Sequence, residues 1–311
     1  MINPTLRQFR YFEALVRHEH FGRAAEASGV SQPALSMQIR ELEETLGSAL
    51  FERGMRQVKL TGFGETVSPR IHDILRSVDE LGDIARIAGK GLAGPLRLGV
   101  IPTIAPYLLP GIIRELSGSF TGTDVQVRET LTDRLIAELS DGRIDAAIVA
   151  LPVSEPSLQE TALFDEEFVL VRPVSAQGEP VPDRDNLRAH RLLLLEEGHC
   201  FRDQALSFCN ISPSLPRDGL DGSSLATLVQ LVGSGIGITL IPEMAVGVET
   251  GSAPVVTDRF SKNPPHRTVG MIWRRSSPLG PQLEQVAEVV RKAAAAKSAA
   301  LPRQSGNAGT R

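Results

Sequence analysis

The sequence predicts an α+β protein of several domains, and three observations lead to this prediction. Residues 1–60 show helical periodicity, one long heptad-patterned helix follows Gly62, and after Pro95 short strands alternate with helical stretches. The 311 residues exceed what one ordinary core needs, and a content of 41% hydrophobic and 23% charged residues is typical of a globular protein. Because the net charge is −4, any contact with nucleic acid would have to come from a local patch.

Residues 1–60 are expected to form three short helices and a hairpin. An apolar stripe at three-residue steps marks the first helix, and it consists of Leu6, Phe9, Phe12 and Leu15. The second helix begins near Phe21 and ends at Gly29, and Ser31 is suited to cap a third helix over residues 33–46. Residues 51–61 alternate between apolar and polar side chains, which predicts a short hairpin.

The second and third helices, joined by a tight Gly-Val-Ser turn, have the pattern of a helix-turn-helix. In this motif the second helix enters the DNA major groove, and its N-terminal residues reach the base edges. Gln32 can pair with adenine, and Ser36 can contact bases or phosphate. The DNA-binding candidates are Ser31, Gln32, Pro33, Ser36, Gln38, Arg40 and, in the hairpin, Arg53. The helix spacing by itself fits a purely structural bundle equally well.

A long helix over residues 63–90 carries apolar residues at alternating steps of four and three. These residues are Val67, Ile71, Ile74, Val78, Leu81, Ala85 and Ala88. Such a seam over three heptads predicts a coiled coil between two copies of the chain. The alternative is a helix that packs on its own domain.

Beyond the linker at residues 89–95, seven apolar segments read as strands interleaved with helices. They are residues 96–101, 125–129, 146–150, 168–172, 192–195, 237–242 and 268–273. This alternation predicts parallel α/β sheets. The strands divide near Phe164 and again near His266, which indicates two subdomains with two chain crossings and a ligand cleft at their junction.

The chain has only two cysteines, Cys200 and Cys209, and a helix is expected to begin near the first. A helix N-terminus stabilises a thiolate, but the neighbouring charges have both signs: His199 and Arg202 are opposed by two glutamates. Nine helical residues span about 13.5 Å, whereas a disulfide needs Cα atoms about 4.4–6.8 Å apart. A disulfide would therefore require this segment to unwind and would act as a conformational switch. The alternative is that both cysteines are ordinary buried apolar residues.

Residues 21–65 resemble the signature of the LysR-type transcription regulators almost position by position. The matching residues are Ala24-Ala25, the run from Ser31 to Ser36, Ile39, Leu42-Glu43, Leu46-Gly47, Leu50-Phe51 and Arg53. The resemblance implies a winged helix-turn-helix domain over residues 1–62, a dimerising linker helix over 63–90 and a periplasmic-binding-protein-like regulatory half over 91–300. Within that half we expect one subdomain at about 94–164 and 268–300, and the other at about 165–267.

Within that family, the chain is similar to the members that sense hydrogen peroxide. The similar strings are GHCFRDQALSFC, IPTIAPYLLP, ALFDEEF and RRSSPL. The resemblance implies that Cys200 is the peroxidatic cysteine and Cys209 the resolving one. It also implies a peroxide pocket formed by Thr103, Thr132, His199, Arg202 and Arg274. Threonine hydroxyls can both donate to and accept from peroxide oxygens, although each threonine could instead cap a helix.

We therefore expect a regulator of oxidative-stress genes and not an enzyme, without metal or cofactor. Its expected partners are promoter DNA, hydrogen peroxide and RNA polymerase, in a homodimer or homotetramer. No membrane helix or signal peptide is evident, which predicts the cytoplasm. Residues 301–311 are expected to be a disordered tail. The alternatives are a LysR-type regulator that responds to a small organic effector without cysteine chemistry, and a thiol peroxidase with a vestigial DNA module.

Overall fold

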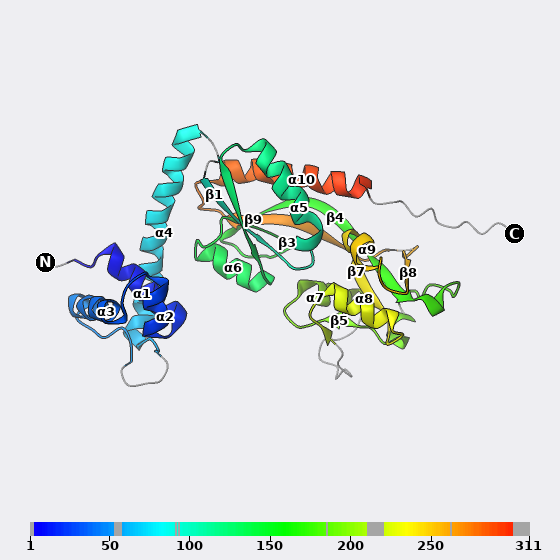
Figure 1. Ribbon diagram of the computed structural model, residues 1–311, viewed down its shortest axis with the longest axis horizontal. Coiled ribbons are helices and arrows are strands. Elements are labelled where there is room, and N and C mark those ends of the chain that lie inside the picture. The colour runs from blue at the N-terminus through cyan, green and yellow to red at the C-terminus, as the bar shows by residue number, and fades with distance from the viewer. Residues whose placement is uncertain are drawn as a thin grey trace. The chain divides into compact units, whose positions relative to one another are not determined.

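The computed structural model describes residues 3–52, 58–90, 92, 94–184, 186–209, 221–261 and 263–300. The expected DNA contact Arg53 and the expected tail at 301–311 lie outside these residues. The chain divides into two compact units, Met1–Ala85 and Arg86–Arg311 (Figure 1). Each unit has its own hydrophobic core.

The N-terminal unit contains three short helices and the beginning of a long one. They are α1 (Leu6–His18), α2 (Phe21–Ala27), α3 (Gln32–Leu46) and α4 (Gly62–Lys90). A capping box starts α1, because the Thr5 hydroxyl accepts from Gln8 N while the Gln8 side chain accepts from Thr5 N. The predicted stripe is buried at Phe9, Phe12 and Leu15, while Leu6 remains exposed. An antiparallel bridge between Phe51 and Leu60 closes the base of the predicted hairpin.

The turn between α2 and α3 has the geometry that the sequence predicts. Gly29 has a φ of 64°, a conformation that favours glycine. The N–H of Val30 donates to the carbonyl of Ala25, and the N–H of Gly29 donates to that of Glu26, which closes the end of α2. Ser31 then caps α3 by accepting from Ala34 N. The turn therefore holds the two helices at a fixed angle.

The long helix α4 divides the predicted heptad seam into two parts. Ile71 is only 4% exposed and packs into the core of the N-terminal unit together with Leu75. Ile74, on another face of the same turn, is 42% exposed, and further along the helix Leu81 is 64% exposed. The beginning of α4 thus packs on its own domain, as the alternative interpretation states, while its later turns present apolar side chains to the outside.

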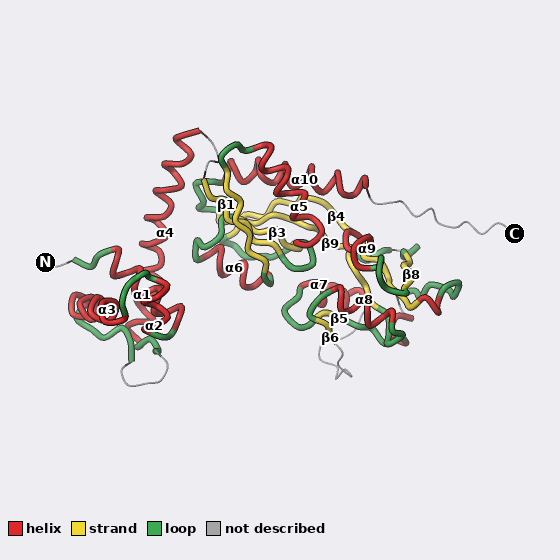
Figure 2. The backbone as a smooth tube through the Cα atoms, in the orientation of Figure 1, coloured by secondary structure: helices red, strands yellow, loops and turns green. Residues whose placement is uncertain are grey.

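A seven-stranded mixed sheet forms the centre of the C-terminal unit (Figures 1 and 2). Its strands are β1 (Gly94–Val100), β2 (Thr123–Glu129), β3 (Ala146–Leu151), β4 (Leu158–Pro173), β7 (Thr239–Pro242), β8 (Val255–Asp258) and β9 (His266–Arg274). The order is β2-β1-β3-β9-β4-β7, with β8 also paired to β4. Only β2, β1 and β3 are parallel, whereas β9 and β4 run antiparallel to their neighbours. The prediction of wholly parallel sheets was wrong, because the outgoing β4 and the returning β9 lie side by side in opposite directions.

The positions of the two predicted subdomain crossings lie within one pair of strands, β4 and β9. Glu166 of β4 lies opposite Arg267 of β9, and the strands shift register between Ala162 and Phe164. The remaining elements are α5 (Ala105–Ser119), α6 (Thr132–Ser140), η1 (Val174–Ala176), η2 (Asn186–Ala189), β5 (Leu194–Leu195), α7 (Cys200–Phe208), β6 (Asp221–Gly222), α8 (Leu225–Gly233), α9 (Glu243–Glu249) and α10 (Gly280–Ala300). Of the helices in the described part of the chain, none has the length and apolar content to cross a bilayer.

Candidate functional site

The two cysteines lie at opposite ends of α7. Cys200 is the first residue of the helix and is half-buried, whereas Cys209 directly follows the helix and is fully buried. Neither cysteine forms a disulfide. Nine residues of rise separate them by about 13.5 Å along the axis, about twice the Cα separation that a disulfide tolerates. The two sulfur atoms can therefore join only if α7 loses its helical structure.

The turn before α7 approaches Leu131, the residue that precedes α6. Gly198 has a φ of 92°, and a Cβ atom on it would lie 3.0 Å from Leu131 Cδ1. Leu131 is the N-cap of α6, and Thr132 is its first residue. Glycine at position 198 thus allows two helix N-termini to approach each other across the junction.

The side chain of Thr132 does not cap α6, because no side-chain hydrogen bond is made at that helix start. Its Oγ1 atom is buried, and within the described residues it has no hydrogen-bond partner. A buried hydroxyl of this kind raises the free energy of the folded state unless another polar group reaches it. The Thr132 hydroxyl is therefore available to a small polar ligand.

Thr103 follows β1 and is held by Arg267. The Arg267 guanidinium donates from Nη1 to Thr103 Oγ1 at 2.8 Å and from Nη2 to the Thr103 carbonyl at 3.1 Å. The same guanidinium lies 5.7 Å from the ring centroid of Phe201, the residue after Cys200. Arg267 thus connects Thr103 to the start of α7. The N-cap of α5 is Ile104, so Thr103 does not cap that helix.

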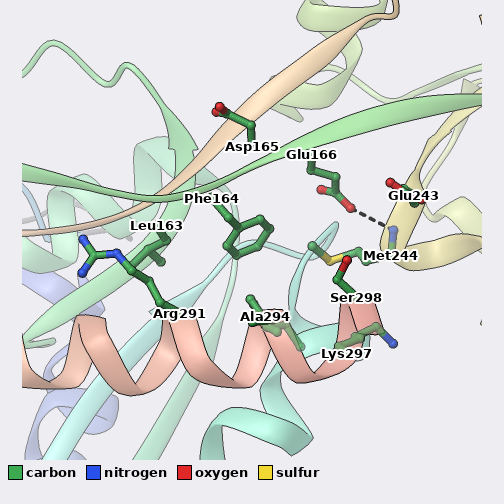
Figure 3. Close-up of a pocket in the computed structure, with 12 residues that line it drawn as sticks. Leu163, Phe164, Asp165, Glu166, Glu243, Met244, Arg291, Ala294, Lys297 and Ser298 are labelled. Atoms are coloured by element: carbon green, nitrogen blue, oxygen red, sulfur yellow. Dashed lines mark hydrogen bonds between the residues drawn. The ribbon is translucent and has the colours of Figure 1, made fainter. Parts of the chain in front are cut away.

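Glu166, on the neighbouring strand β4, fixes the position of Arg267. Its Oε2 atom accepts from Arg267 Nε at 2.9 Å, and its Oε1 atom accepts from Met244 N at 2.9 Å, at the start of α9. Figure 3 shows the second bond at one end of a cavity of about 410 Å³ between the crossing strands and α10. Neither cysteine lines this cavity, so it is separate from the thiol site.

His199 and Arg202 supply less positive charge to Cys200 than the sequence analysis assumes. Burial lowers the pKa of His199, and nearby Glu196 opposes this effect, so the imidazole is neutral at pH 7. Arg202 donates from Nη1 to the Leu195 carbonyl at 2.7 Å and to Asp221 Oδ2 at 2.6 Å. Its charge is therefore paired, and its hydrogen bonds tie α7 to β5 and β6.

Arg274 does not join the residues around Cys200. Its Nη1 atom donates to the carbonyls of Leu139 at 2.6 Å and Ile144 at 3.2 Å, at the C-terminal end of α6. Thr132 lies at the opposite end of that helix, seven residues or about 10 Å away along the axis. The structure therefore places Arg274 where it stabilises helix-end carbonyls, whereas the buried Arg267 of the same strand lies against the Phe201 ring.

The predicted DNA-contacting residues of the N-terminal unit lie at the beginning of α3 and on the face of α3 that is turned away from the core. Leu35, Ile39 and Leu42 point into the core. The opposite face and the first turn carry residues that are exposed or, for Ser36 and Gln38, half-buried, and these are Ser31, Gln32, Pro33, Ser36, Gln38 and Arg40. Because the Ser31 hydroxyl oxygen only accepts in its cap, its proton remains available for a phosphate oxygen.

Two family models match the chain. A bacterial regulatory helix-turn-helix protein model of the lysR family matches residues 6–65, and a LysR substrate binding domain model matches residues 89–295. The chain belongs to the LysR family. The sequence-based assignment of an N-terminal helix-turn-helix and a periplasmic-binding-protein-like regulatory half is therefore confirmed.

Relatives that resemble the chain along most of its length include hydrogen peroxide-inducible genes activators and OxyR proteins. A probable hydrogen peroxide-inducible genes activator from Streptomyces viridosporus is 42% identical over 295 residues, which cover 93% of this chain and 94% of that protein. A full-length OxyR variant from Pseudomonas aeruginosa has 35% identity and a TM-score of 0.73, covering 93% of this chain and 98% of that one. A hydrogen-peroxide-bound OxyR mutant from Corynebacterium glutamicum has 35% identity and a TM-score of 0.66, covering 96% and 95%.

Two residues of this LysR site escaped the sequence analysis. Arg267 is a charged residue at a predicted chain crossing, immediately before an apolar strand, and this position could have drawn attention to it. Gln204 lies one helical turn after Cys200 on the same face of α7, and its Oε1 atom is buried without a partner among the described residues. The i, i+4 spacing from Cys200 is a signal that could have identified Gln204.

Proposed function

We propose that the chain is a DNA-binding transcription regulator that senses hydrogen peroxide through reversible formation of a Cys200–Cys209 disulfide. The observation that carries the proposal is the placement of the two thiols at opposite ends of α7. Because the disulfide cannot form across an intact helix, oxidation must change the fold of this segment. The names of the full-length relatives support peroxide as the signal.

The chemistry requires two steps, each with hydroxide as the leaving group. The Cys200 thiolate attacks one peroxide oxygen, so that an S–O bond forms, the O–O bond breaks, and hydroxide leaves and takes up a proton. The Cys209 thiolate then attacks the Cys200 sulfur, an S–S bond forms, and the second hydroxide leaves as water. Overall, two thiols and one hydrogen peroxide give one disulfide and two waters. A cellular dithiol reductant resets the pair by exchange.

The residues near Cys200 have separate roles in this proposal. The unpartnered hydroxyl of Thr132 and the Arg267-held hydroxyl of Thr103 orient the peroxide. The neutral imidazole of His199 borders the same helix start. Arg202 positions α7 through its bonds to Leu195 and Asp221 rather than contacting peroxide with a free charge.

A thiol count after titration with one equivalent of hydrogen peroxide tests the sensor. The wild-type chain should lose both thiols. Cys209→Ser should stop at a single sulfenic acid, and Cys200→Ser should keep its buried thiol. A wild-type chain that retains both thiols at low micromolar peroxide would refute peroxide sensing. If Cys200→Ser also left promoter induction intact, the signal would instead be a small organic effector.

The same proposal includes the DNA partner and the assembly. Dimers paired through α4 place two α3 helices about 34 Å apart, one turn of promoter DNA, and regulatory halves pair further into a tetramer in the cytoplasm. On DNA, the regulator changes transcription of oxidative-stress genes through RNA polymerase. Gln32→Ala should weaken binding mainly to the cognate sequence, whereas Arg40→Ala should reduce the salt dependence of all DNA binding. Equal loss on cognate and random DNA for Gln32→Ala would contradict base readout by α3.

A further inference from the structure

We propose that Arg184 is a clamp on the C-terminal end of α7 that favours the dithiol form and so sets the redox potential of the Cys200–Cys209 pair. This inference rests on the proposed thiol switch and adds a residue that controls it. Arg184 lies in the segment before η2, outside α7 and outside the group of residues around Cys200.

Three contacts join Arg184 to the last turn of α7. Its Nη2 atom donates to the Ser207 carbonyl at 3.3 Å, and its Nε atom donates to the Phe208 carbonyl. The guanidinium also lies over the Phe208 ring, 5.4 Å from the centroid. The same ring packs edge-on against Phe260, with the centroids 5.2 Å apart. The last turn of α7 is thus held by two residues distant in sequence.

The position of the clamp matches a general need of helix ends. The last four carbonyls of a helix have no partner within the helix, and they carry the negative end of its dipole. A guanidinium that donates to two of these carbonyls satisfies both and adds a favourable charge. In this chain the two carbonyls belong to Ser207 and Phe208, the residues immediately before Cys209.

Formation of the disulfide must break these contacts. Cys209 directly follows Phe208, whose carbonyl Arg184 holds, and the Cys209 N–H donates to the Ala205 carbonyl at 3.0 Å. In the proposed switch the fully buried Cys209 leaves the core to reach Cys200, and Phe208 and Ser207 move with it. Arg184 precedes η2, where Leu187 is fully buried, so in this proposal it stays with its own segment. The clamp therefore stabilises the dithiol form alone, and its removal shifts the equilibrium toward the disulfide.

Equilibration with glutathione measures this shift directly. The reaction is protein dithiol plus glutathione disulfide giving protein disulfide plus two glutathione thiols. Arg184→Met keeps the aliphatic stem and removes the charge and donors, and it should raise the equilibrium constant about fivefold, a potential about 20 mV more negative. Arg184→Lys keeps the charge without the planar fork and should lie between. Lys292→Ala, an exposed cation on α10, is the control and should follow the wild-type curve.

A second measurement separates a clamp from a merely structural arginine. Thermal unfolding of the dithiol form should occur at a lower temperature in Arg184→Met, while the disulfide form should unfold at the wild-type temperature. Equal destabilisation of both forms, or an unchanged equilibrium constant, overturns the clamp and leaves the switch intact. If the wild-type chain forms no disulfide at any glutathione ratio, the switch itself fails and the clamp fails with it.

Discussion

The buried ion pair between Glu166 and Arg267 allows a quantitative prediction. Both side chains are almost fully inaccessible, at 4% and 0% exposure, and the Arg267 Nη2 atom lies 2.8 Å from Glu166 Oε2. Arg267→Met leaves the Glu166 carboxylate buried with the Met244 N–H as its remaining donor, and Thr103 loses both of its donors. Removal of one partner from such a pair costs about 3–5 kcal/mol of the free energy of unfolding.

Urea unfolding followed by the fluorescence of Trp273 measures this cost. Trp273 is the only tryptophan of the chain, lies in β9 and is buried, so it reports on the regulatory half. The double variant Glu166→Gln with Arg267→Met removes the uncompensated charge, so it should recover most of the free energy of unfolding that Arg267→Met loses. Arg275→Met, on the exposed end of the same segment, should cost less than about 1 kcal/mol. If Arg267→Met costs no more than that control, or if the two single costs simply add, the pair does not act as a buried unit.

Three other predictions follow from local features. Because burial lowers the pKa of His199, the unfolded chain binds a proton more readily than the folded chain. The contribution of His199 to stability is therefore complete above about pH 6.5 and is lost as the pH falls below it. His199→Gln should make the urea midpoint less dependent on pH across that range. Leu81→Lys, at an exposed apolar position of α4, should convert dimers to monomers, as measured by analytical ultracentrifugation. An unchanged mass would show that α4 does not form the dimer interface. Gly64→Ala would place a Cβ atom 2.2 Å from the Leu50 carbonyl and should lower the melting temperature by circular dichroism; Gly82→Ala in the same helix meets nothing within 4 Å and should not.

The helical N-terminal unit could be predicted well because its signals are local. Gly29 and Gly47 adopt the positive φ values that their positions at helix ends suggest, and Ser31 accepts the expected capping hydrogen bond. The heptad pattern of α4 was informative but incomplete. It could not show that Ile71 and Leu75 are buried by the chain's own α1–α3 core, since that contact depends on tertiary packing.

The central sheet was less predictable because its pairing is not local. The first half of β4, from Leu158 to Glu167, carries many polar residues and was not identified as a strand. It is held by pairing with β9, about one hundred residues later in the chain, and no sequence window contains both partners. The same distance hid the antiparallel direction of β9 and the short strand β8.

The thiol pair could be located from spacing and resemblance, whereas its electrostatic surroundings could not. His199 and Arg202 are adjacent to Cys200 in sequence, yet burial makes one neutral and Asp221 pairs with the other. Arg267 was overlooked and Arg274 chosen in its place, although both lie on β9. What distinguishes them is tertiary: Arg267 pairs with Glu166, 101 residues away, whereas Arg274 donates to carbonyls at the C-terminal end of α6.

The structure of α7 also explains how the sensitivity of such a sensor can change without any change in its chemistry. A nine-residue helix is marginal by itself, so its helical form depends on tertiary contacts. Those contacts are the buried faces of Phe201, Ala205 and Leu206, the bonds of Arg202 to β5 and β6, and the contacts of Arg184 at the other end. In the proposed switch the disulfide forms only when the helix opens, so each contact opposes oxidation by the free energy that it contributes to the helical form alone. A substitution of Arg184, whose contacts lie at the end of α7 away from Cys200, should therefore shift the peroxide threshold while the proposed pocket stays unchanged.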